Sequence, residues 1–393
     1  MTACNSVRCR FLFREVNERG YDLPLASVTK NGGVEFRADL DISVWNPGDD
    51  TSMYKRVLPG DFVIGLRSFQ SGIGYSPLAG LVSPAYTVLR PLGNFVDGFY
   101  RHFFKSQEFI SRLENVAQGI RQGRTISTEA FYGLHVPVPP IAEQRAIADY
   151  LDAETARIDA LIEKKRRMVA LLDAQREAFI DYVIWTDVSG AGPLKHRTDQ
   201  SRPIMYGIVL PGPSVSDGVP IVKGGDVAAR RLSPELLNRT TPAIEAPYVR
   251  ARLAPNDLVF AIRGGVGDVE IVPPELAGAN ITQDVARVSC ADDVRAHWLH
   301  FVLQTARVKQ QVEARTTGAT IRGLNIWELK RIQVPMSNLE RQESDLDRLQ
   351  PMAERNDAIG SALASQIDLL IEHRQALITA AVTGELTLPG VAA

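Results

Sequence analysis

The feature that most constrains this chain is an internal repeat. Short stretches of the first half recur in the same order in the second half, at an offset close to 196 to 198 residues. The matched stretches are 59–67 with 255–263, 78–80 with 276–278, 123–126 with 318–321, 138–139 with 334–335, and 174–180 with 372–378. One such match is weak, but five in order at nearly one offset indicate duplication of a whole structural unit.

Each repeat begins with a globular part. It is rich in glycine and proline and contains short runs of strand-forming residues, such as 61–64 and 257–260. The proline-containing entry to each run is typical of a turn that leads into a strand. We therefore expect a small mixed domain, with several short strands, at the start of each half.

Each repeat ends in a long helix. Residues 141–183 contain no internal glycine or proline and follow Pro139 and Pro140. The second helix follows Pro335, and Pro351 and Gly360 are expected to kink or interrupt it. A helix of about 40 residues is roughly 60 Å long, far above the usual length in globular proteins.

Apolar residues in three- and four-residue steps predict that the two helices pair as an antiparallel coiled coil. The alternative is that each helix only caps its own domain. The predicted pairing residues are Ile147, Leu151, Ile158, Leu161, Leu172, Phe179, Leu349, Ile359, Leu363, Ile367, Leu370 and Leu377.

The sequence thus predicts an α+β protein with an internal pseudo-two-fold repeat, in which two similar globular domains are separated by two long paired helices. The expected divisions are a first domain at 1–140, a helix at 141–183, a linker and second domain at 184–338, a helix at 339–384, and a tail at 385–393.

Composition places few limits on function. The formal net charge is −2, but the two globular parts carry small positive excesses, of +2 for 1–140 and +3 for 184–338. This distribution permits nucleic-acid binding without requiring it. Three scattered cysteines argue against a disulfide framework and fit a reducing cytoplasm. No apolar run is long enough to predict a transmembrane helix.

A search for catalytic motifs favours a protein that is not an enzyme. The sequence contains no phosphate-binding Gly-x-x-x-x-Gly-Lys-Ser/Thr loop, and its six histidines show no metal-ligand spacing. The glycine-rich stretch 264–268 lacks the spacing of a dinucleotide fingerprint and is better explained as a turn. A nuclease assembled from dispersed residues is the remaining enzymatic alternative.

Several motifs resemble those of the specificity subunits of type I restriction-modification systems. The most specific is the Pro-Pro-Ile-Ala-Glu-Gln-Arg start of the first helix, and the resemblance extends over almost the whole chain. The similar stretches are 81–91, 137–152 and 155–165 in the first half, and 206–212, 263–267 and 278–281 in the second.

This resemblance implies that each globular part is a target recognition domain that reads one half of a bipartite DNA site. It implies that the paired helices set the distance between the halves and dock two methyltransferase subunits, which use S-adenosylmethionine to methylate adenine. Restriction subunits that use ATP and Mg would join through the complex, and no cofactor is expected in this chain. The alternative is a repeat scaffold whose helices mediate assembly without base-specific reading.

One departure from the family pattern lies at the start of the second helix. It lacks the second proline, and Gln and Arg exchange places in its Leu-Glu-Arg-Gln sequence. The helix is still expected, whereas the family pattern does not define its contacts at that end.

Reading DNA requires side chains that donate to and accept from base edges, together with contacts to phosphates. We looked for arginine, lysine and polar side chains in glycine-rich, loop-like contexts. Arg67 and Arg263 occupy the same repeat position, where a structural role at a strand end is the alternative. The candidates are Tyr54, Lys55, Arg67, Ser68, Gln70, Arg121, Arg124, Lys223, Arg230, Arg231, Arg263, Arg315 and Arg322.

Overall fold

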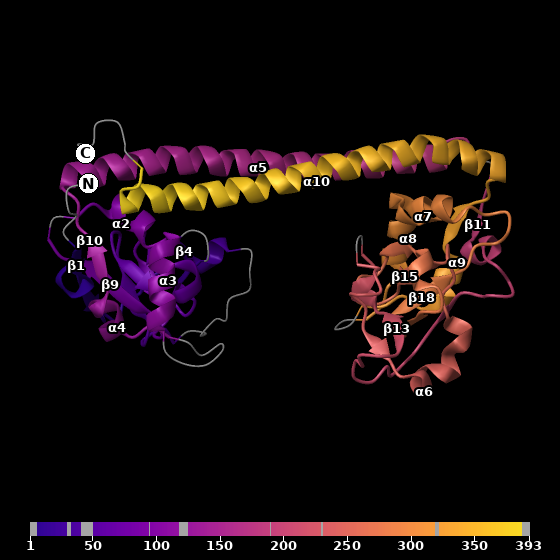
Figure 1. Ribbon diagram of the computed structural model, residues 1–393, viewed down its shortest axis with the longest axis horizontal. Helices are drawn as coiled ribbons and strands as arrows, with labels where there is room; N and C mark the ends of the chain where they lie inside the picture. Colours follow the sequence, from indigo (N-terminus) through magenta and orange to yellow (C-terminus); the bar gives the residue numbers. More distant parts are fainter. Residues whose placement is uncertain are drawn as a thin grey trace. The chain divides into compact units, whose positions relative to one another are not determined.

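The computed structural model describes residues 6–29, 33–40, 50–93, 95–117, 125–188, 190–228, 231–318 and 322–386. The chain divides into two compact units (Figure 1). The first comprises Met1–Arg166 with Ala364–Ala393, and the second Arg167–Leu363. The division falls within the long helices and not at their ends, where the sequence had placed the domain boundaries. The reason is that the ends of both helices pack into the domain cores.

The first unit is built on the four-stranded antiparallel sheet β2-β9-β6-β7, accompanied by the pairs β1-β10, β3-β4 and β5-β8. Its strands are β1 (Ser6–Arg8), β2 (Phe13–Val16), β3 (Ala26–Val28), β4 (Val34–Phe36), β5 (Lys55–Val57), β6 (Phe62–Ile64), β7 (Gly74–Tyr75), β8 (Gly80–Val82), β9 (Thr87–Pro91) and β10 (His135–Pro137). Its short helices are α1 (Ser68–Ser71), α2 (Asp97–Phe103), α3 (Gln107–Val116) and α4 (Thr128–Gly133).

The second unit repeats this plan with the antiparallel sheet β12-β18-β15-β16, the pair β11-β19 and the sheet β14-β13-β17. Its strands are β11 (Ala191–Pro193), β12 (Met205–Tyr206), β13 (Val219–Val222), β14 (Arg239–Thr240), β15 (Leu258–Ala261), β16 (Val269–Ile271), β17 (Asn280–Ile281), β18 (Val285–Val288) and β19 (Gln333–Pro335). Its short helices are α6 (Pro242–Glu245), α7 (Ala296–Gln304), α8 (Ala306–Arg315) and α9 (Ile326–Arg331).

The two cores occupy equivalent places but differ in composition. The first is aromatic, with the ring of Phe13 packed edge-on against Phe62 at a centroid distance of 5.6 Å. The second is largely aliphatic and surrounds Trp298, which is fully buried. The predicted α+β duplication is therefore confirmed, with different side chains filling the same frame.

The long helices are α5 (Ile141–Trp185) and α10 (Leu339–Thr383). They end within two residues of the expected positions, and α10 continues through Pro351 and Gly360, so the expected interruption is wrong. Pro351 is exposed, and water can therefore hydrogen-bond the carbonyl that loses its helical partner.

The starts of the two helices are anchored in the same way, despite the departure in sequence. Gln144 Oε1 accepts a hydrogen bond from the Val96 amide at 3.3 Å, and Gln342 Oε1 accepts one from the Arg295 amide at 2.8 Å. Both glutamines are buried and lie 198 residues apart. The glutamine thus keeps its repeat position in both helices, and the reading of Gln and Arg as exchanged is corrected.

The helices pair antiparallel within each unit (Figure 1). In the first unit, Asp159 contacts Arg374 and Lys165 contacts Gln366. In the second, Arg176 contacts Asp357 and Val183 contacts Arg341. In the second unit Arg176 Nη1 lies 3.1 Å from Asp357 Oδ1, and in the first Arg374 Nε lies 2.9 Å from Asp159 Oδ1. Both arginines and both aspartates are 198 residues apart. The two pairs are therefore reciprocal copies of one interaction, as a pseudo-two-fold repeat requires.

The stripe of buried side chains on the helices differs in part from the predicted one. Leu161 and Ile359 are 41% and 38% exposed, so their predicted pairing is wrong. The buried stripe passes instead through Ile162, which is next to Leu161 and is 6% exposed. The other predicted residues are buried or half-buried: Ile147, Leu151, Ile158, Leu172, Phe179, Leu349, Leu363, Ile367, Leu370 and Leu377.

We expect the reciprocal ion pairs to contribute modestly to helix pairing. In double-mutant cycles with Arg176→Ala and Asp357→Ala, the coupling free energy should be about 0.5 kcal/mol, because both groups are partly solvated. Urea unfolding followed by helical circular dichroism would measure it. The cycle for Arg374 and Asp159 should give a similar value, and strict additivity in both cycles would contradict the pairing.

Candidate nucleic-acid interface

Three of the predicted DNA-contacting residues of the first domain lie inside it. Lys55 is 7% exposed, and its Nζ donates to the Tyr86 carbonyl at 2.6 Å. Ser68 is 1% exposed, and its Oγ accepts a hydrogen bond from the Gly65 amide at 2.9 Å. Tyr54 is also buried. The predicted contacts of these three side chains with DNA are therefore corrected to structural roles.

Arg67 and Gln70 are both exposed in the first domain. They lie at the start of α1 and within it, in the connection between β6 and β7. Arg121 and Arg124 fall outside the described residues, so their predicted role stays a prediction.

The second-domain candidates are distributed over several loops. Arg231 is exposed, but its guanidinium donates to the Gly225 carbonyl at 3.0 Å, while Lys223 is half-buried at the start of a 3₁₀ turn. Arg315 lies 3.4 Å from Glu328 and is half-buried. Arg230 lies outside the described residues. These contacts make Arg231 and Arg315 partly structural, and their predicted contacts with DNA remain untested.

Arg263 and Arg322 are exposed, as Arg231 is, among the described second-domain candidates. Arg263 Nη1 lies 3.9 Å from Asp284, a loose ion pair that leaves its side chain 48% exposed. Arg322 is exposed and borders a cleft of 670 Å³. Both residues can therefore reach a ligand without breaking a close contact inside the domain.

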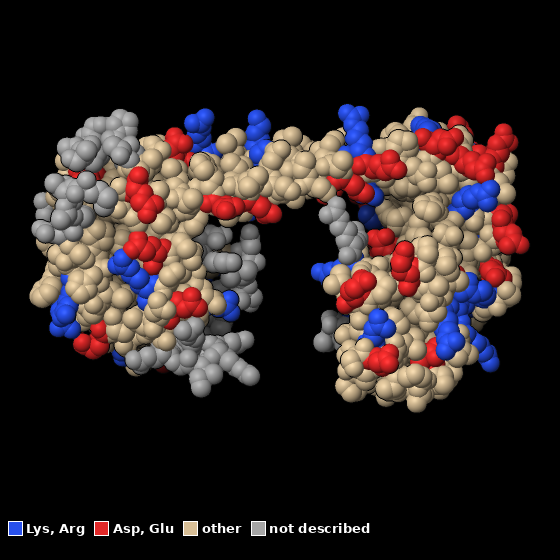
Figure 2. All heavy atoms as spheres, viewed as in Figure 1, with Lys and Arg blue, Asp and Glu red and all other residues tan. Residues whose placement is uncertain are grey.

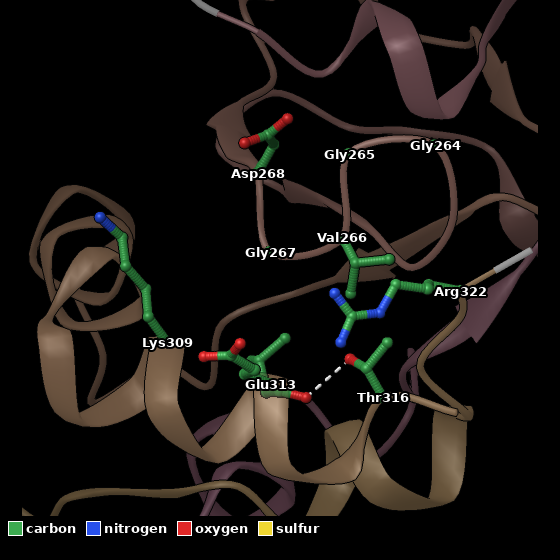
Figure 3. A pocket seen from close by; sticks show the side chains of 10 residues that line it. Gly264, Gly265, Val266, Gly267, Asp268, Lys309, Glu313, Thr316 and Arg322 are labelled. Atoms are coloured by element: carbon green, nitrogen blue, oxygen red, sulfur yellow. Dashed lines mark hydrogen bonds between the residues drawn. The ribbon is translucent and has the colours of Figure 1, made fainter. Parts of the chain in front are cut away.

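The cleft lies between the β15–β16 connection and α8 (Figure 3). Gly264, Gly265 and Gly267 form one wall and all have positive φ, which glycine alone adopts readily. In Figure 3 the Arg322 guanidinium reaches toward Thr316 at the end of α8. The other lining side chains belong to Val266, Asp268, Lys309, Val312 and Glu313. The lining of the cleft thus contains both hydrogen-bond donors and acceptors, as contact with DNA requires.

Charge alone does not mark a single binding face. In the view of Figure 2, basic and acidic side chains are interspersed over each domain. Recognition would therefore depend on particular exposed side chains and not on a broad basic surface.

Sequence reasoning missed Leu66, which is 53% exposed beside Arg67. Its repeat equivalent, Ile262, is 4% exposed. An apolar residue at the end of a strand pattern is read as core, so no sequence signal distinguished the two positions.

The described residues contain no group of three or more histidine, cysteine or acidic side chains arranged to hold a metal ion. In the same part of the chain, no helix combines the length and apolar content needed to cross a bilayer.

Comparison with proteins of known structure identifies the class of fold. A chain from a structure described as "Structural basis underlying complex assembly and conformational transition of the type I R-M system" matches with a TM-score of 0.73 and 16% identity. The match covers 98% of this chain and 99% of that one. The duplicated domains and paired helices therefore form a fold that is found in type I restriction-modification systems.

Sequence comparison is more specific. The chain is 23% identical over 291 residues to the Escherichia coli type I restriction enzyme EcoBI specificity subunit, covering 67% of this chain and 60% of that protein. It is 28% identical over 166 residues to the EcoKI specificity subunit of E. coli strain K12, covering 40% and 35%. No protein-family model matches the sequence. The resemblance to type I specificity subunits is confirmed in sequence and fold, and the matches span about 60% or less of these relatives' lengths.

Proposed function

We propose that this chain is the DNA-specificity subunit of a type I restriction-modification complex. Each domain reads one half of a bipartite DNA target, and the paired helices set the number of unspecified base pairs between the halves. The chain itself performs no catalysis in this proposal.

The observation that carries the proposal is the full-length fold match, together with the matches to specificity subunits. Duplication of the domain supports a bipartite target, because two similar frames can each bind duplex DNA. The side chains on these frames differ. Arg67 and Gln70 stand on a helical turn in the first domain, whereas the glycine-walled cleft occupies the corresponding connection of the second. Different half-sites, and hence an asymmetric target, follow from this difference.

Partners would supply the chemistry. We propose that two methyltransferase subunits bind, because a duplicated chain offers two similar surfaces. They would use S-adenosylmethionine to methylate adenine, and restriction subunits would use ATP and Mg. An adenine in duplex DNA must leave the base stack to be methylated, which the methyltransferase subunits would do. The task of this chain would be to select the DNA sequence.

The surface available to such partners on the long helices excludes several apolar residues that are buried, namely Ile162, Ile180, Val183 and Ile378. The exposed apolar side chains of the long helices are Leu161, Met168, Leu171, Tyr182, Ile359, Leu369 and Ile371. We propose these residues as part of the docking surface, since exposed apolar groups often mark interfaces.

The proposal predicts sequence-selective binding of duplex DNA. We expect the full-length chain, alone or in the complex purified from its cells, to select from a random duplex pool two conserved blocks at a fixed spacing. Sequencing of the bound DNA measures this, in the presence of non-specific competitor at stated salt. Selection of one block, or of none, would contradict the bipartite reading and favour a scaffold without base recognition.

A further inference from the structure

The short helix α1 is held in place by polar contacts at both ends. At its start, Ser68 Oγ accepts the Gly65 amide hydrogen bond at 2.9 Å. At its end, Lys105 Nζ donates to the Ser71 carbonyl at 2.9 Å. Phe69, between these two contacts, belongs to the aromatic core. A four-residue helix would not be stable alone, so these contacts determine its position.

Lys105 is an unusual residue to find in such a contact. Burial, together with the nearby charge of Arg374, lowers the pKa of its ammonium group to about 8. Its one recorded side-chain contact in the described part of the chain is the bond to Ser71. Partial burial of a lysine there costs free energy, and its hydrogen bond fixes the end of α1.

Three exposed side chains lie immediately before α1 or within it. Leu66 is 53% exposed, and Arg67 and Gln70 are both exposed. Arg67 and Gln70 are three residues apart at one helical turn, so they lie on the same face. Neither side chain has a recorded hydrogen bond or ion pair to another described residue, which leaves both free to bind.

The second domain has no such element. Its corresponding connection, 262–268, is shorter than 65–73 and contains a glycine turn in place of the helix. In the first domain α1 lies against α3. In the second, the equivalent space beside α8 is the open cleft. The exposed trio on α1 is therefore a property of the first domain alone.

We propose that α1 is the base-reading element of the first domain, with Arg67, Gln70 and Leu66 as its specificity-determining side chains and Lys105 as a positioning residue. This inference rests on the proposed function. Arginine pairs with the O6 and N7 of guanine, glutamine with the N6 and N7 of adenine, and an apolar side chain packs on the thymine methyl group. A rigid support is what such geometry needs.

Selection from a random duplex pool by the full-length chain tests the proposal. Arg67→Ala and Gln70→Ala should each relax one position of one half-site, with discrimination falling roughly 5- to 150-fold there. The other half-site should be unchanged. Arg10→Ala is the matched control, because Arg10 is an exposed arginine of the same domain that pairs with Glu129 of α4, and it should leave the selected sequence as it is.

Two variants of Lys105 separate positioning from general stability. Lys105→Met removes the donor to Ser71 and should relax both positions read by α1, while the other half-site is retained. Lys105→Gln keeps an N–H donor and should restore part of the discrimination. Equal behaviour of the two variants would overturn the positioning role.

Other outcomes would overturn the reading role. Arg67→Ala could instead lower the affinity equally for all sequences and reduce the salt dependence of binding by about one phosphate contact. That result would make Arg67 a contact to the DNA backbone. An unchanged selected sequence in both Arg67→Ala and Gln70→Ala would remove α1 from the recognition surface. If the unmodified chain selects no sequence at all, the proposed function itself fails, which is a distinguishable result.

Discussion

Replacing Asp61 with alanine should destabilise the first domain by about 3 kcal/mol and leave the second domain almost unaffected. Asp61 is 1% exposed, and its carboxylate binds Arg90 through two bonds of 2.8 and 2.9 Å. It also accepts the Leu58 amide at 2.9 Å. The loss leaves the amide of the half-buried Leu58 without its acceptor. Arg90 keeps its bond to Glu18, so the effect should fall at the lower end for broken buried ion pairs.

The duplicated fold supplies the matched variant. Asp257 occupies the same repeat position and is 3% exposed. Its carboxylate binds Arg202 at 2.8 and 2.7 Å and accepts the Ala254 amide at 2.7 Å. Asp257→Ala should therefore destabilise the second domain by a similar amount.

Amide hydrogen exchange measured peptide by peptide distinguishes the two variants. Asp61→Ala should accelerate exchange about 100-fold in β6 and β9 but not in β15 and β18, and Asp257→Ala should do the reverse. Acceleration of both sheets by either variant would mean that the two domains unfold as one unit. A change below about 5-fold in the affected sheet would show that the buried carboxylate contributes little.

These two aspartates also show where sequence reasoning stops. The repeat aligned Asp61 with Asp257 and placed each at a turn before a strand, as the structure has them. Their partners are not equivalent, because Arg90 comes from β9 and Arg202 from the loop before β12. A sequence repeat predicts a shared backbone. The side-chain contacts made on that backbone differ between the two copies.

The candidate site shows the same limit. The loop-like setting of 65–73 predicted Arg67, Ser68 and Gln70 alike, and it could not show that Ser68 is buried while Arg67 and Gln70 are exposed. On a four-residue helix, one position decides between core and surface. The prediction for Lys55 was wrong for another reason. A lysine in a short strand is normally exposed, but Lys55 donates to a carbonyl below the surface.

Acid should destabilise the second domain through His300. This side chain of α7 is largely buried, and its Nε2 lies 3.0 Å from the Val269 carbonyl. A neutral imidazole donates that bond. Burial lowers the pKa of His300 from 6.5 to about 4. The unfolded chain therefore binds a proton between pH 6.5 and 4 that the folded domain does not, so stability falls as pH falls through this window. The full effect below pH 4 is about 3 kcal/mol.

The comparison that isolates this effect is between the native chain and His300→Gln. The glutamine amide can still donate to Val269 but does not titrate. Glu270 lies 3.7 Å from His300 Nε2, and burial raises the pKa of its carboxyl group. Its protonation therefore favours the folded state as the pH falls, in the native chain and in His300→Gln alike. The difference between them therefore reports His300. Urea unfolding followed by tryptophan fluorescence should show the native chain losing more stability than His300→Gln between pH 7 and 4.5. Parallel losses in the two proteins would mean that the imidazole takes up its proton without leaving the folded core.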